Sequence, residues 1–178
     1  MRQVVVTPYD ELWPEAFALE SARLTSSICN QQISIHHIGS TAIPGLSAKP
    51  IIDMLAVVDC IKSLDQQERH WQAIGYEAMG EFGISGRRYF RKNESAWRRT
   101  HQVHAFQLGS PQIDRHLAFR DFMIAHPVYA KEYESLKLQL AESYPNDIAG
   151  YCNGKDAFIR QIDVIAAQWR ASTNDRRK

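Results

Sequence analysis

The sequence lacks the cysteine spacing of a disulfide framework or a zinc site, because its three cysteines are scattered and no CxxC occurs. An odd, dispersed set of this kind is typical of a reducing compartment, so we expect a cytoplasmic protein. Long apolar runs are missing too, and the first residues, MRQVVVTPYDELWPE, contain no apolar core of signal-peptide length. We therefore expect no membrane partner.

The chain has no marked excess of either sign of charge, since its formal net charge is +1. This balance argues against nucleic-acid binding through bulk charge, although a local basic patch would still permit it. The standard phosphate-loop motifs are also absent. Gly39 and Gly45 are separated by five residues, Leu46 stands where a Walker loop requires lysine, and there is no GxGxxG.

Hydrophobic periodicity predicts strands mainly in the first two thirds of the chain and helices at the end, which is an α+β pattern. The predicted strands are 4–6, 33–38, 51–58, 76–79, 88–91 and 103–108, and the predicted helices are 14–29, 64–74, 113–125 and two more beyond residue 127. Asn153 is a candidate N-cap for the last helix. We expect one domain over residues 1–172, with residues 173–178 frayed.

The segment 36–58, HHIGSTAIPGLSAKPIIDMLAVV, places Asp53 inside a run that otherwise suits burial. A buried charge is costly unless it is paired, protonated or bound to a metal. Earlier in the segment, Gly39 and Ser40 follow a strand, where they can open a short helix whose N–H groups face an anion. In the structural alternative, Gly39 and Ser40 only begin an ordinary turn. Asp53 would then be hydrogen-bonded to backbone N–H groups or to an arginine.

A basic segment at 87–99 contains five arginines and Lys92, interleaved with Tyr89 and Phe90. Arginine forks suit phosphate and aromatic rings suit base stacking, so Arg88 is a candidate phosphate ligand. A solvated, charge-rich hairpin is the alternative. Lys49 and Lys155 are two further candidate phosphate ligands.

Several long motifs occur in order: HIGSTAIPGLSAKPIIDM, GEFGISGRRYFRK, HQVHAF and RHLAFRDFMIAHP. Together they resemble the GrpB family over nearly the whole chain. The resemblance implies a nucleotidyltransferase fold of the DNA polymerase β type, and a similar domain occurs fused to dephospho-coenzyme A kinase. A small mixed sheet should then carry helices, with the C-terminal helices forming one wall of a cleft.

The resemblance also implies roles for individual residues. Asp53 would be a catalytic metal ligand for Mg²⁺ or Mn²⁺, His104 would face the same site, and Gly39 with Ser40 would hold phosphate. The chain departs from the active pattern, because Ile51 and Leu55 stand where a second carboxylate would complete acid-x-acid.

Three functions are therefore compatible with the sequence. The chain could be a metal-dependent enzyme that transfers a nucleoside monophosphate or otherwise acts on a nucleotide or another phosphate-bearing small molecule. It could instead be a non-catalytic module that binds a nucleotide or coenzyme A. The third function, which the near-neutral charge does not favour, is that of an RNA-binding or folding-accessory domain.

Overall fold

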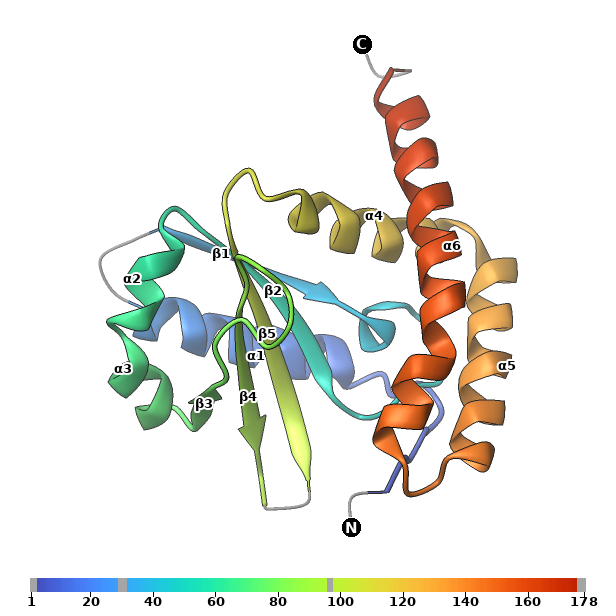
Figure 1. Cartoon of the computed structure of the whole chain (residues 1–178), viewed down its shortest axis with the longest axis horizontal. Helices are drawn as coiled ribbons and strands as arrows, with labels where there is room; N and C mark the ends of the chain where they lie inside the picture. The colour runs from blue at the N-terminus through green and yellow to red at the C-terminus, as the bar shows by residue number, and fades with distance from the viewer. Residues whose placement is uncertain (1–2, 29–31, 96–97, 176–178) are drawn as a thin grey trace.

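The structure is a computed structural model that describes residues 3–28, 32–95 and 98–175. It is built on a five-stranded mixed sheet (Figure 1). The strands are β1 (Ile33–Ile38), β2 (Ile52–Val58), β3 (Tyr76–Ala78), β4 (Arg88–Asn93) and β5 (Arg99–Gln107). Their order across the sheet is β1-β2-β5-β4-β3; β2 and β5 are parallel and the other neighbours are antiparallel.

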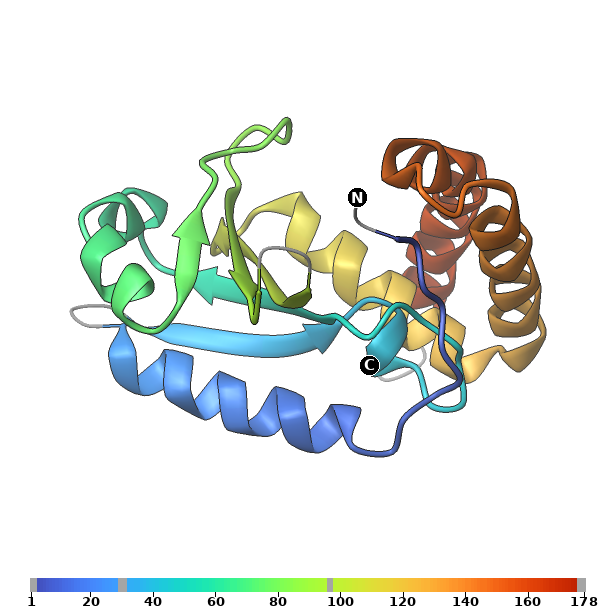
Figure 2. The same ribbon diagram turned by 90° about the horizontal axis from the view of Figure 1, so that it is seen from below.

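Helices lie before, between and after the strands along the chain. They are α1 (Trp13–Ser27), the 3₁₀ turn η1 (Ser40–Ala42), α2 (Ile61–Asp65), α3 (Glu68–Ala73), α4 (Pro111–Ala125), α5 (Pro127–Ser143) and α6 (Ile148–Asp175). Figure 2 shows α1 below the sheet, and α5 and α6 at the right, beyond one end of the sheet. Among the described residues, none of these helices combines the length and apolar character that a membrane span requires.

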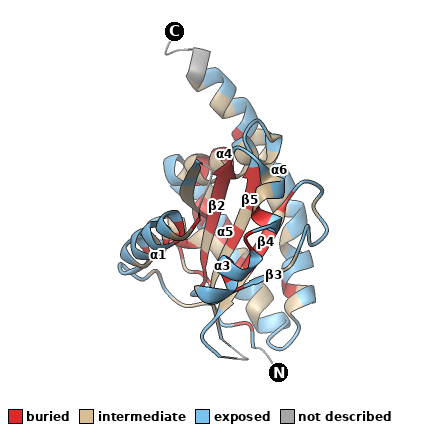
Figure 3. Cartoon of the chain, turned by 90° about the vertical axis from the view of Figure 1, so that its left-hand side faces the viewer, coloured by how far each residue is buried: buried red, intermediate tan, exposed pale blue. Residues whose placement is uncertain are grey.

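The two sheet faces carry different side chains because successive residues of a strand point to opposite sides. On the face toward α1 and α3, Met54, Phe90 and Val103 belong to the largest apolar cluster. On the other face, Leu55 and Phe106 pack with residues of α4. The central strands β2 and β5 are accordingly the most buried part of the sheet (Figure 3).

A third apolar cluster joins the C-terminal helices to one another and to the segment after η1. Its buried members include Phe122 of α4, Tyr133 of α5 and Ile162 of α6, together with Ile43 and Leu46. The helical layer is therefore attached to the loop that leads from β1 to β2. This attachment places the helices beside the end of the sheet that carries Asp53.

The predicted fold class is confirmed, and the strand β1 has the predicted bounds. Three details differ from the expectations. Residues 4–6 form no strand, because the Val4 N–H donates to the Pro145 carbonyl beside the α5–α6 turn. The predicted helix at 64–74 is two short helices, α2 and α3.

The third difference concerns the start of α6, which lies five residues before Asn153. Asp147 precedes the helix, and its Oδ1 accepts a hydrogen bond from the Gly150 N–H at 2.9 Å. This carboxylate therefore caps the helix, and Asn153 lies within it. At the other end α6 continues to Asp175, and residues 176–178 lie outside the described part.

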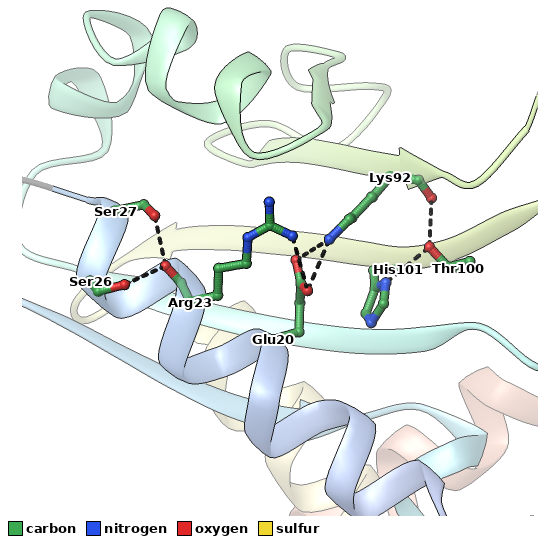
Figure 4. A network of polar contacts seen from close by, with 7 residues as sticks. All are labelled: Glu20, Arg23, Ser26, Ser27, Lys92, Thr100 and His101. Carbon is green, nitrogen blue, oxygen red and sulfur yellow. Dashed lines mark hydrogen bonds and ion pairs between the residues drawn. The ribbon is translucent and has the colours of Figure 1, made fainter.

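A buried polar network ties α1 to the sheet on the face away from the C-terminal helices (Figure 4). The Lys92 Nζ donates to both carboxylate oxygens of Glu20, at 2.8 and 2.9 Å, and the two side chains are 18% and 10% exposed. Arg23 lies 4.0 Å from the same carboxylate. Burial and this carboxylate raise the pKa of Tyr76, whose ring lies under Lys92. The network anchors α1 to the outer half of the sheet.

We expect Lys92→Met to lower the free energy of unfolding by about 3 kcal/mol, because it leaves the Glu20 carboxylate buried without its closest partner. The double variant Glu20→Leu/Lys92→Met should recover most of this loss, since it buries no unpaired charge. Guanidinium chloride denaturation of the three proteins measures both effects. A loss below about 1 kcal/mol in the single variant would show that the pair behaves as a solvated one.

Candidate functional site

A cavity of about 630 Å³ lies between the sheet and the C-terminal helices. Its lining comes from the β1–β2 connection, from one face of β2, β4 and β5, and from α4, α5 and α6. This volume is within the range of pockets that bind small molecules. The cavity therefore joins segments that are far apart in the sequence.

Asp53 points into this cavity from β2, and its side chain is 29% exposed. In the sheet Asp53 is paired with Ile38 of β1, so the turn that begins at Gly39 passes directly over it. Gly39 has φ 71°, and a Cβ at this position would lie 2.6 Å from the Asp53 Oδ2. Both the backbone conformation and the contact therefore require glycine. Asp53, Gly39 and Ser40 all line this one cavity.

His104 lies beside Asp53, with 3.9 Å between its Nε2 and the Asp53 Oδ1. The other ring nitrogen, Nδ1, lies 3.2 Å from a guanidinium nitrogen of Arg87. A guanidinium can only donate, so Nδ1 is the acceptor and the neutral ring carries its proton on Nε2. His104 thus presents an N–H group, not a lone pair, to Asp53 and the pocket.

Tyr89, Gln102 and Arg99 form the outer part of the same sheet face. The Tyr89 hydroxyl donates to the Gln102 Oε1 and lies 3.1 Å from a guanidinium nitrogen of Arg99 that donates to it. The Nε of Arg99 is buried and has no hydrogen-bond partner within the described ranges. A buried donor without a partner is costly, so this N–H raises the free energy of the folded protein.

Cationic side chains outnumber carboxylates in the cavity lining. The lysines and arginines that line it are Lys49, Lys137, Lys155, Arg99 and Arg115. Asp53 is the only carboxylate lining it in the part of the chain that the structure describes. Two of the lysines lie against one ring, with the Nζ of Lys49 and Lys155 4.8 and 4.5 Å from the Tyr151 centroid. Such a lining favours an anionic ligand.

Lys137 is the most deeply placed of these cations, with 2% of the residue exposed. Its Nζ donates to the Ser47 carbonyl and lies 4.8 Å from the Tyr133 ring centroid. Burial, and next the charge of Lys155, lower the pKa of Lys137 to about 7. Near neutral pH an anion in the cavity would therefore favour the protonated form of Lys137.

His116 of α4 lines the cavity next to His104, with 5.6 Å between the two ring centroids. Burial, followed by the charge of Arg115, lowers the pKa of His116 to about 2. A guanidinium nitrogen of Arg115 also lies 3.2 Å from its Nε2, which must accept. His116 is thus a neutral ring, and the net positive charge of the lining comes from the lysines and arginines.

The structure brings together all but one of the residues that the sequence singled out. Gly39, Ser40, Lys49, Asp53, His104 and Lys155 all line the cavity. Arg88 does not, because it points to the other face of the sheet and binds both Asp65 oxygens, at 2.5 and 2.8 Å. The sequence pattern could not place Asp65, which supplies this partner.

Most of the basic segment is neutralised in the same way. Arg91 is paired with Glu77 at 2.6 Å, Lys92 with Glu20, and Arg98 with Glu94 at 2.9 Å. Arg87 donates hydrogen bonds to the carbonyl groups of Glu81 and Phe82 and to His104. Among the described residues of this segment, Arg99 is the only cation that lines the cavity, so the segment does not form the anion-binding hairpin that its composition suggests.

Two of the cavity cations come from positions that sequence reasoning passed over. These two cations are Arg115 and Lys137, and neither is among the candidate site residues of the sequence. One signal for Lys137 is present in the sequence, because it lies four residues after Tyr133 and therefore on the same buried helix face. A lysine on such a face needs a polar partner or a function.

The donor set does not fit the two-metal site of an active nucleotidyltransferase. Such a site needs several carboxylate oxygens, and here only Asp53 supplies them. Within the described ranges, no group of three or more His, Cys, Asp or Glu side chains is arranged to hold a metal ion. Glu77 and Glu81 do not line the cavity, and they accept hydrogen bonds from Arg91 and from the Gly86 N–H.

Comparison with known proteins assigns the chain to a family. A model of the GrpB protein family matches residues 3–164. The chain belongs to the GrpB family. YqkA of Bacillus subtilis, a UPF0157 protein, is 46% identical over 98% of this chain, which spans only about half of YqkA. A dephospho-CoA kinase of Mycolicibacterium paratuberculosis is 26% identical over 96% of this chain and 47% of its own length. The expected likeness to that kinase is confirmed.

Solved structures agree with the family and the fold. GrpB from Enterococcus faecalis superposes with a TM-score of 0.87 at 44% identity, covering 93% of this chain and 99% of that one. The poly(U) polymerase Cid1, in a complex with its product ApU, gives a TM-score of 0.51 at 13% identity, over 84% of this chain and 48% of its own. The GrpB chain therefore has a nucleotidyltransferase-like fold, and the second likeness shows the fold alone.

We expect neutral His104 to be the Nε2–H tautomer, because Arg87 donates to its Nδ1. Nitrogen chemical shifts of the labelled imidazole, measured by NMR, distinguish the two tautomers. In Arg87→Met the constraint is removed and a mixture should appear, whereas Arg91→Met, a change on an outer arginine paired with Glu77, should leave the tautomer unchanged. A wild-type ring protonated on Nδ1 would contradict the assignment.

Proposed function

We propose that this GrpB protein binds a nucleotide, or another small molecule bearing several phosphates, in the cavity between its sheet and its C-terminal helices. The observation that carries the proposal is the charge of the lining, in which five lysines and arginines accompany one carboxylate among the described residues. Arginine and lysine are the side chains that proteins use to bind phosphate.

The arrangement of the cations supports a ligand with more than one phosphate. Lys49 precedes β2, Lys137 and Lys155 come from α5 and α6, and Arg99 and Arg115 from β5 and α4. The charges thus approach the cavity from several elements. Ser40 adds a hydroxyl group at the Gly39 turn. A ligand with several phosphates could bind more of these lysines, arginines and hydroxyl groups at once than a ligand with a single carboxylate.

Metal-dependent nucleotidyl transfer is the narrower alternative, and the fold favours it. Asp53 with His104 would be its catalytic pair, and Mg²⁺ or Mn²⁺ its metal. The donor set argues against it, since Asp53 has no second carboxylate beside it and His104 offers an N–H group. Binding without nucleotidyl transfer therefore fits the described residues better. The likeness to a dephospho-CoA kinase makes a coenzyme A precursor one candidate ligand.

RNA binding has less support than a small-molecule ligand. The basic segment that suggested it is largely paired with acids, at Asp65, Glu77, Glu20 and Glu94. Phosphate contacts to a long nucleic acid require cations that are free to replace counterions. The lysines and arginines of the cavity lie instead around a space of small-molecule size.

We expect wild-type protein to bind ATP and to bind adenosine much more weakly, because the cations contact only the phosphates. Lys155→Met should weaken ATP binding about tenfold or more, since one charged hydrogen bond is worth about 1.5–3 kcal/mol. Lys131→Met, a change of an exposed lysine of α5 outside the cavity, is the matched control and should have no effect. Titration calorimetry measures all three. Equal or undetectable binding of ATP and adenosine would remove the nucleotide proposal.

Asp53→Asn distinguishes metal-free binding from binding through a divalent cation. With EDTA present, we expect the variant to bind ATP about fivefold more tightly, because removing a nearby negative charge saves about 1 kcal/mol of repulsion. Asp59→Asn, at an exposed position outside the cavity, is the control. If Mg²⁺ or Mn²⁺ tightened binding in wild type and not in Asp53→Asn, the metal-dependent alternative would replace the simpler one.

A further inference from the structure

Phe82 is an apolar side chain in an unusual position. It is 60% exposed, yet it lines the cationic cavity. An isolated exposed apolar residue needs no explanation, but the backbone of this one does. Its φ is 45°, and it is the only residue other than glycine with a positive φ in the part of the chain described here. A bulky residue rarely adopts this conformation, so the surrounding structure must hold it there.

Arg87 is the side chain that holds the turn of Phe82. One guanidinium nitrogen donates to the Phe82 carbonyl at 2.6 Å, and the Nε donates to the Glu81 carbonyl at 3.2 Å. The turn is closed further by the Gly86 N–H, which donates to the Glu81 carboxylate at 2.7 Å. Arg87 is only 6% exposed, so these bonds are shielded from water.

The ring of Phe82 begins a row of aromatic groups that leads to Asp53. It stacks on Tyr89, with centroids 5.2 Å apart and planes 27° apart. Tyr89 is next to His104, at 5.3 Å between centroids, and His104 is next to Asp53. The third nitrogen of Arg87 donates to His104, so one side chain positions both ends of this row.

We propose that Phe82 is the stacking surface for the planar base of a nucleotide whose phosphates lie among the cavity lysines. This inference rests on the proposed phosphate-binding function and adds the chemical class of the other end of the ligand. An exposed ring held by a strained turn can stack on either a purine or a pyrimidine, because every base has a π-face. Arg87 is a positioning residue for Phe82.

ATP and inorganic tripolyphosphate share a triphosphate, and only ATP has a base. Comparing their binding therefore tests the base end of the site apart from the phosphate end. With calorimetry, we expect Phe82→Leu to weaken ATP binding about tenfold, which is 1.4 kcal/mol, and to leave inorganic tripolyphosphate binding unchanged. Phe82→Tyr keeps an aromatic ring and should bind ATP as wild type does. Leu108→Ala, which changes another exposed apolar residue outside the cavity, is the matched control.

The outcomes distinguish the inference from the function on which it rests. Suppose that wild type binds both ATP and tripolyphosphate. If Phe82→Leu then weakens the binding of both equally, or of neither, the base-stacking role is wrong and phosphate binding stands. If wild type binds neither ligand, both are wrong. A measurement on wild type alone gives a second test: the adenine protons of bound ATP should shift upfield in the NMR spectrum through the ring current of Phe82. Unshifted adenine protons in a complex that binds through its triphosphate would overturn the inference.

Discussion

The contact between the backbone of Gly39 and the carboxylate of Asp53 is the constraint on which the rest of the site depends. Any side chain at Gly39 would overlap this carboxylate, and the positive φ there turns the chain out of β1 directly above it. The turn carries Ser40 into the cavity, and the loop beyond it binds α5 through Ser47, whose N–H donates to Glu134 and whose carbonyl accepts from Lys137. The helical wall therefore takes its position from the turn over Asp53.

Lysine and arginine side chains have different surroundings on the two sides of the sheet. On the side of α1, Lys92 meets Glu20 inside the protein, and at the edge Arg88 meets Asp65, so these cations stabilise the fold. On the cavity side Lys49, Lys137 and Lys155 lie against aromatic rings. Arg115 is paired with Asp163, and Asp53 is the only carboxylate that lines the cavity among the described residues. Unbalanced charge that is kept inside a cavity raises the free energy of the empty protein, and an anion relieves it.

Arg87 links the two ends of the cavity. It sets the proton of His104 on the side of Asp53 and holds the strained turn at Phe82, with three hydrogen bonds from one buried guanidinium. A lysine could not form this planar set of bonds. Because Arg87 donates to Nδ1, the neutral ring of His104 carries its proton on Nε2 and donates toward Asp53. A histidine that binds a metal ion would instead need a lone pair on the nitrogen facing the metal.

The sequence by itself determined the α+β class, the bounds of β1, and the approach of Gly39, Ser40 and Asp53, because these depend on local periodicity and on a single strand–turn–strand unit. Only the tertiary structure decided which cations reach the cavity. Arg88 was lost from the site to Asp65, 23 residues away, and Lys137 and Arg115 were added from helices. Ion pairing and helix packing join residues that are distant in sequence, so periodicity carries no information about which partner each charge finds.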